Sequence, residues 1–67
     1  MRILINSPDE ALVIDCGVWQ PVGAALMFMD AKIVSHVRGE DRISHERQKL
    51  GTVTYVPAAG TILYEAQ

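Results

Sequence analysis

Residues 22–38 read VGAALMFMDAKIVSHVR, and this stretch decides most of the fold. The segment 22–29 carries no polar side chain, so its pattern fits a buried strand and a short buried helix equally well. Alanine, leucine and methionine favour helix, whereas a length of eight residues favours strand. Residues 32–38 alternate, which is typical of a strand. We therefore expect two strands, 22–29 and 32–38, joined in a hairpin by a bend at Asp30 and Ala31.

Alternation in residues 32–38 also predicts which side chains share a face. Every second residue of a strand points the same way. One face is expected to hold Ile33, Ser35 and Val37, and the other Val34, His36 and Arg38.

The N-terminal segment predicts a β-hairpin. Residues 2–6 are rich in β-branched side chains, and 11–16 alternate so that Leu12, Ile14 and Cys16 share one face. Between them, Ser-Pro-Asp-Glu at 7–10 suits a type I turn, because proline presets the backbone angle of the second turn position. Since Cys16 ends an apolar alternation, we expect a small buried residue there and not a reactive thiol.

Three further stretches complete the pattern. Residues 17–21 end in Pro21, which cannot donate to a ladder, so they form a connection or an edge. Residues 41–50 have acids at the start, bases near the end and Gly51 beyond, the charge order of a helix, although they offer only a thin apolar stripe. A long polar loop is the alternative. Residues 51–56 and 61–65 read as strands around a turn at 57–60.

Together these patterns predict a mainly β protein. We expect a small antiparallel β-sandwich or open barrel of five to six strands, with one short helix or loop at about 41–50. The 67 residues allow one domain, spanning 1–67.

Size and cysteine content favour self-association. A chain of this length buries a modest core, and small domains often gain support from disulfides, metals or a second copy. The sequence has one cysteine and two histidines nine residues apart, so neither an internal disulfide nor a metal site is expected. The surface predicted to self-associate comprises Trp19, Leu26 and Phe28, since a tryptophan in a connection and a run apolar on both faces suit an interface. The alternatives are that Trp19 caps the end of the core and that the apolar run is a central buried strand or helix.

Charge is unevenly distributed along the chain. The whole sequence carries 6 Lys+Arg and 8 Asp+Glu, for a net charge of -2. Five of the six basic residues fall between 32 and 49, where they exceed the three acids by two. This basic segment predicts a partner-binding face composed of His36, Arg38, Arg42, His45, Arg47 and Lys49. We expect a protein partner; contacts with RNA phosphates and bases are the alternative.

Catalysis is not expected from the sequence. No nucleophile elbow, phosphate loop or zinc-protease motif is present, and the titratable residues gather in one polar segment, as on a solvated face. We predict no catalytic residue and no cofactor. The longest apolar run, 22–29, is too short to span a bilayer, so no membrane partner is expected. A cytoplasmic protein with a reduced thiol follows.

Two short stretches resemble bacterial RNA-binding families. Residues 38–50 are similar to a segment of the tryptophan-activated RNA-binding attenuation protein family through Arg38, Gly39, Asp41, His45, Lys49 and Leu50. That resemblance implies a ring-forming β-sandwich in which Lys49 contacts RNA. The family's later Lys-x-Arg motif, however, has no counterpart after Gly51.

The other resemblance concerns the N-terminus. The opening of the chain is similar to that of the carbon storage regulator family through Met1, Ile3, Leu4, Glu10, Leu12 and Ile14. It implies a dimer of interleaved strands, with Arg47 as an RNA-binding residue once a gap is inserted. Two arginines follow the first strand in that family, whereas Asn6 and Ser7 stand here.

The sequence thus predicts a non-enzymatic regulatory or inhibitory interaction protein that self-associates and binds a macromolecular partner. Compact chains without catalytic or targeting signals are common among the regulators of bacteria and their phages. An RNA-binding regulator and a small structural subunit of a larger assembly are the alternatives.

Overall fold

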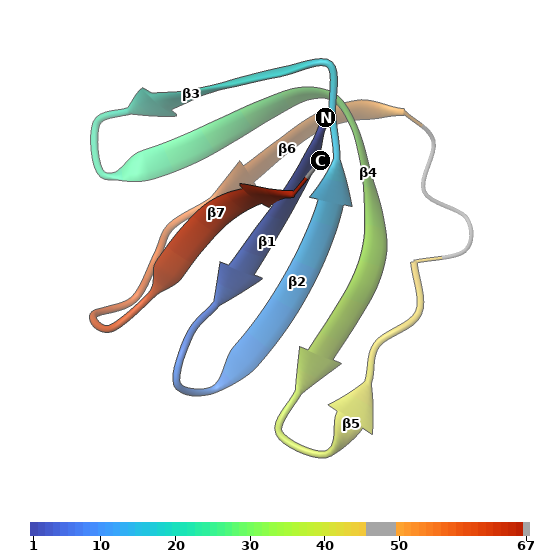
Figure 1. The fold of residues 1–67 in the computed structure, drawn as a ribbon, viewed down its shortest axis with the longest axis vertical. Coiled ribbons are helices and arrows are strands. Elements are labelled where there is room, and N and C mark those ends of the chain that lie inside the picture. Colours follow the sequence, from blue (N-terminus) through green and yellow to red (C-terminus); the bar gives the residue numbers. More distant parts are fainter. Residues whose placement is uncertain (46–49, 67) are drawn as a thin grey trace.

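The computed structural model describes residues 1–45 and 50–66, which form an antiparallel half-barrel of seven strands without a helix (Figure 1). The strands are β1 (Arg2–Asn6), β2 (Glu10–Asp15), β3 (Val18–Val22), β4 (Ala25–Arg38), β5 (Asp41–Arg42), β6 (Gly51–Tyr55) and β7 (Ile62–Ala66). The predicted mainly β, antiparallel class is confirmed.

The predicted N-terminal hairpin is present. β1 pairs with β2 from Arg2↔Asp15 to Asn6↔Ala11. Its turn is closed by Ser7, whose N–H and hydroxyl both donate to the carbonyl of Glu10, while the same hydroxyl accepts from the Glu10 N–H. The hydroxyl reinforces the turn, as serine side chains commonly do.

The predicted hairpin at Asp30 and Ala31 is wrong, because β4 runs through these residues as one strand of 14 residues. Asp30 has a φ of 51°, and the pairing of β4 with β6 shifts register between Phe28 and Ala31. A single left-handed residue with a register shift makes a bulge, which bends a strand without reversing it. The reversal instead occurs at Gly23 (φ 61°), where β3 turns back to pair with the first half of β4.

A second irregularity of β4 overturns the predicted alternation. Against β2, Val13 pairs with Ser35 and Ile14 pairs with Ile33, so Val34 is an extra residue in the ladder. The bulge reverses the facing of everything beyond it. His36 therefore lies opposite the buried Leu12 and is itself buried, on the same side as Ile33.

The left-handed backbone conformation of Asp30 predicts how substitutions at this position change the stability of the fold. Changing Asp30 to valine is expected to lower the free energy of unfolding by about 1 kcal/mol, because β-branched residues adopt the left-handed region at a cost. Urea unfolding followed by circular dichroism measures the change. Asp30→Gly is the matched control, since glycine adopts positive φ freely. Equal stability of the valine and glycine variants would contradict the role given to the bulge.

Of the short helix or loop predicted at about 41–50, the described part contains no helix. Asp41 and Arg42 are β5, which pairs back onto Arg38 and Val37 across a turn containing Gly39 (φ 61°). Residues 43–45 are neither helix nor strand, and 46–49 lie outside the described residues. Pairing with the end of β4 outweighs the weak helical charge pattern, because a helix with little to bury is marginal.

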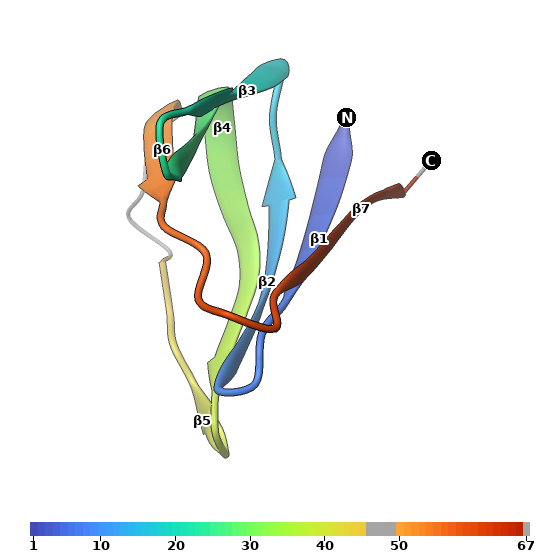
Figure 2. The same ribbon diagram turned by 90° about the vertical axis from the view of Figure 1, so that its left-hand side faces the viewer.

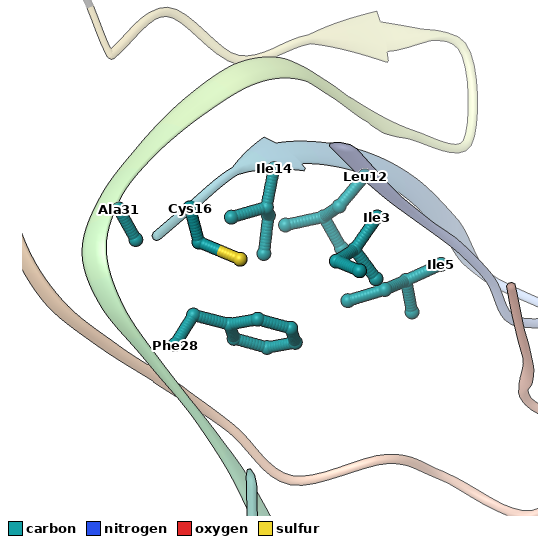
Figure 3. Close-up of a cluster of buried hydrophobic side chains, with 7 residues drawn as sticks. All are labelled: Ile3, Ile5, Leu12, Ile14, Cys16, Phe28 and Ala31. Atoms are coloured by element: carbon teal, nitrogen blue, oxygen red, sulfur yellow. The ribbon is translucent and has the colours of Figure 1, made fainter. Parts of the chain in front are cut away.

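The core lies inside the bend of the sheet. Its buried apolar residues, among those described, are Ile3, Ile5, Leu12, Ile14, Cys16, Phe28 and Ala31. Figure 2 shows how β4 curls so that β3 and β6 stand away from β1 and β7. In Figure 3 the ring of Phe28 faces the side chains from β1 and β2 across the interior. Cys16 is buried, as predicted, and burial raises the pKa of its thiol.

The position of Phe28 differs from its predicted place on a self-association surface. Its side chain is 0 % exposed, so it belongs to the core and is not available to a self-association surface in this fold. Periodicity within 22–29 could not reveal this, because both faces are apolar in sequence. The described residues contain no helix that is long and apolar enough to cross a membrane.

Candidate functional site

Three titratable side chains from distant parts of the chain form a hydrogen-bonded series. His36, in β4, has its Nε2 2.9 Å from Oε2 of Glu10 in β2. Its Nδ1 lies 3.0 Å from Nε2 of His45, in the segment after β5. The side chains of His36 and Glu10 are only 10% and 17% exposed. This series ties the segment after β5 to the two central strands.

Chemistry fixes the direction of the bond between His36 and Glu10. A carboxylate only accepts, so Nε2 of His36 carries the proton that it donates to Glu10. In a neutral His36, Nδ1 then accepts from the Nε2–H of His45. Arg38 also donates to Oε2 of Glu10 from Nε and Nη2, each at 3.3 Å. These donors lower the pKa of Glu10 below its ordinary value, with the bond from His36 as the largest cause.

The predicted partner-binding residues divide into three groups. His36 is a buried member of the Glu10 series and faces the interior. Arg38 and Arg42 are exposed or partly exposed at the end of β4 and in β5, and His45 follows them. Arg47 and Lys49 lie outside the described residues. Partner binding by the remaining residues stays a prediction.

Sequence reasoning missed Glu10 as a site residue. It stands 26 positions before His36, at the end of the predicted turn, and its side chain had no predicted role in a site. No local motif links the two residues. The register of β2 against β4, including the bulge at Val34, brings them together.

A hollow of ≈ 660 Å³ lies beside β4. Among the described residues its lining includes five consecutive positions of that strand, 32–36, together with 42–45. Arg2 and Asp15 extend the hollow beyond the strand.

Arg2 and Asp15, which both line this hollow, form a bidentate ion pair. Nε of Arg2 lies 2.7 Å from Oδ1 of Asp15, and Nη2 lies 3.0 Å from Oδ2. The pairing lowers the pKa of Asp15 and raises that of Arg2. Both side chains are about half exposed, so the pair orients the two groups more than it stabilises the fold.

Trp19 and Leu26, predicted to self-associate, lie against the core. The Trp19 ring stacks on Phe28 with centroids 6.1 Å apart, and its Nε1 donates to Oε1 of Glu65 at 3.0 Å. This bond links β3 to β7 across the open side of the half-barrel. Both residues are partly buried, so the structure offers little of either to a second copy.

Uncharged side chains, most of them apolar, lie on the outer face of β7, β1, β2 and β4, opposite the core. We define this outer face by two cross-strand rows. Their members, read from the strand register, are Ile62, Asn6, Ala11 and Val37 in one row and Tyr64, Leu4, Val13 and Ser35 in the other. None of these eight residues is charged. Ile62 is 63% exposed and Tyr64 46%.

The third outward row is charged and borders the uncharged ones. It comprises Ala66, Arg2, Asp15 and Lys32. A negative group thus lies between two positive groups, next to the apolar rows.

Within residues 1–45 and 50–66, no group of three or more His, Cys, Asp or Glu side chains is placed to hold a metal ion. Comparison with protein-family models, curated proteins and solved structures finds no match to this chain, and so lends no further support to the two short sequence resemblances.

Proposed function

We propose that this chain is a small non-enzymatic interaction protein of the cytoplasm that associates with a second copy through the outer face. The observation that carries the proposal is the absence of charge from both rows of that face, over four adjacent strands. In an antiparallel sheet, the face that is exposed to solvent ordinarily carries polar side chains. A contiguous apolar surface on such a face therefore indicates an interaction site.

Two further features favour a second copy as the occupant. The bordering row reads positive, negative, positive at Arg2, Asp15 and Lys32, so two copies related by a twofold axis can place opposite charges together. The buried apolar core among the described residues is small, and a domain of this size gains support from covering more apolar surface.

The edge strand β7 gives further support to the outer face as the interface. It pairs only with β1 among the described strands, and its outward residues Ile62, Tyr64 and Ala66 carry no charge. Edge strands are commonly protected by charge, proline or short length. β3 carries Pro21 and β5 has two residues, whereas β7 has neither feature. Its one charged residue, Glu65, lies on the opposite face, where it accepts from Trp19.

A regulatory role and a reducing compartment are consistent with this arrangement. The histidines and Glu10 are bonded to one another, which supports a structural task for these groups. The lone cysteine is a buried thiol, as suits the cytoplasm.

Sedimentation equilibrium tests the proposal. The wild-type chain is expected to be a dimer at micromolar concentration, and Ile62→Lys with Tyr64→Lys is expected to raise the dissociation constant at least roughly tenfold, because two charges would be buried in the interface. The matched control replaces Val18 and Val22, exposed apolar residues of β3, with lysine. A wild-type chain that is monomeric up to millimolar concentration, or equal effects of the two variant pairs, would refute it.

A further inference from the structure

We infer that His36 and His45 form a pH-sensitive clasp, which holds the segment after β5 against β4 and opens when both imidazole rings carry a positive charge. The segment consists of residues 43–45, and the clasp joins described residues to one another. His36 lies on the buried side of β4, apart from the rows of the outer face.

Among the described residues, two hydrogen bonds attach this segment to β4, and both end at His36. The N–H of Ile43 donates to the carbonyl of His36 at 2.8 Å. Nε2 of His45 lies 3.0 Å from Nδ1 of His36, and the ring planes are 16° apart with centroids at 5.2 Å. Because both contacts meet at one residue, a change in the charge of the two rings acts directly on the attachment of the segment.

The bond between the rings needs one nitrogen that carries no proton. A neutral imidazole has one donor and one acceptor, whereas a charged imidazole has two donors. When one ring of the neutral pair gains a proton, it donates to the free nitrogen of the other, and such charge-assisted bonds are strong. When both rings are charged, both facing nitrogens are donors and the rings repel each other. The clasp therefore tolerates one added proton and opens on the second.

The charged groups around the two rings come from several strands. Glu10 in β2 accepts from Nε2 of His36, and Arg38 in β4 bonds to the same oxygen. The described residues that line the space beside the rings contribute further charges on Arg2, Asp15, Lys32 and Arg42. Asp15 is engaged by Arg2, so the remaining charges of that described lining are positive and repel a second charged imidazole.

Mildly acidic solution is where the clasp is expected to open. Histidine ordinarily changes its charge between about pH 5 and 8, and two rings in contact take up their protons as a coupled pair, in two steps. The bond from His36 and those from Arg38 lower the pKa of Glu10 from its ordinary value of 4.5, so this carboxylate stays charged while the clasp opens. Opening of the clasp is thus separated in pH from the loss of the Glu10 bond.

Hydrogen exchange of the full chain, followed by nuclear magnetic resonance, tests the inference. The quantity measured is the protection factor of the Ile43 amide, which compares its exchange rate with that of an unfolded chain at the same pH. In wild type this factor is expected to fall at least roughly fivefold from about pH 7.5 to about pH 5, because the clasp no longer holds the segment. Amides in the hairpin of β1 and β2 are expected to keep their protection.

Two substitutions of His45 separate the clasp from a general effect of acid. The side-chain amide of His45→Gln offers both a donor and an acceptor at either pH, so it can pair with neutral or charged His36. Its Ile43 protection factor is expected to change by less than about twofold. His45→Ala removes the bond and is expected to give low protection at both pH values. Unchanged protection in wild type, an equal fall in the glutamine variant, or wild-type protection in the alanine variant at neutral pH would overturn the inference.

Discussion

Replacing Phe28 with alanine is expected to unfold most of the protein. Its ring fills the space between the curled half of β4 and the side chains of β1 and β2 (Figure 3). Truncating a buried phenylalanine costs about 3–5 kcal/mol, from lost burial and the cavity left behind. A chain of 67 residues has roughly 3–10 kcal/mol of stability in total, so the change removes a large share.

Far-UV circular dichroism and urea unfolding measure this effect. Val22→Ala is the matched control, because Val22 is an apolar residue of β3 that is 49% exposed, and its loss should change stability by at most about 0.5 kcal/mol. The same experiment decides between core and interface. A Phe28→Ala chain that keeps its fold and loses only oligomers would place Phe28 on a self-association surface and contradict the fold described above.

Replacing Glu10 with glutamine is expected to lower stability by about 1–3 kcal/mol at neutral pH, because a charged acceptor of bonds from His36 and Arg38 is lost near a buried imidazole. The effect also has a defined pH dependence. The donors lower the pKa of Glu10 in the folded state from the ordinary value of 4.5. The stability that Glu10 contributes is therefore present above about pH 4.5 and lost as the pH falls through the lowered value.

Chemical unfolding at a series of pH values isolates this contribution. The difference in free energy of unfolding between wild type and Glu10→Gln should narrow as the solution is acidified below pH 4.5. Asp9→Asn is the control, since Asp9 neighbours Glu10 in the sequence and has no hydrogen-bond partner for its side chain among the described residues. A gap that stays constant down to strongly acidic pH would show that the Glu10–His36 bond does not form in solution.

Short-range patterns sufficed for the hairpin of β1 and β2 and for the strands near the C-terminus. Each is decided by neighbours in the sequence: alternation, β-branched residues and a turn with serine, proline or glycine. The burial of Leu12, Ile14 and Cys16 followed from the same alternation. The interior of β4 was harder, because its two bulges depend on strands that are distant in sequence.

The candidate sites depended on those bulges. The sequence placed His36 with Arg38 on a surface, and an extra residue at Val34 moved it inside, where Glu10 meets it. β5 and β6 likewise pair with opposite halves of one long strand. No local pattern in the sequence encodes this division.

The sequence by itself determined that this protein is mainly β, that its strands are antiparallel and where most of them lie. Those properties follow from side-chain alternation and turn chemistry, which act over a few residues. Only the tertiary structure decided which apolar residues form the core, which face remains outside and which titratable groups meet. A one-residue bulge changes the facing of every residue beyond it, and the register that fixes a bulge is set by pairing between strands far apart in the chain.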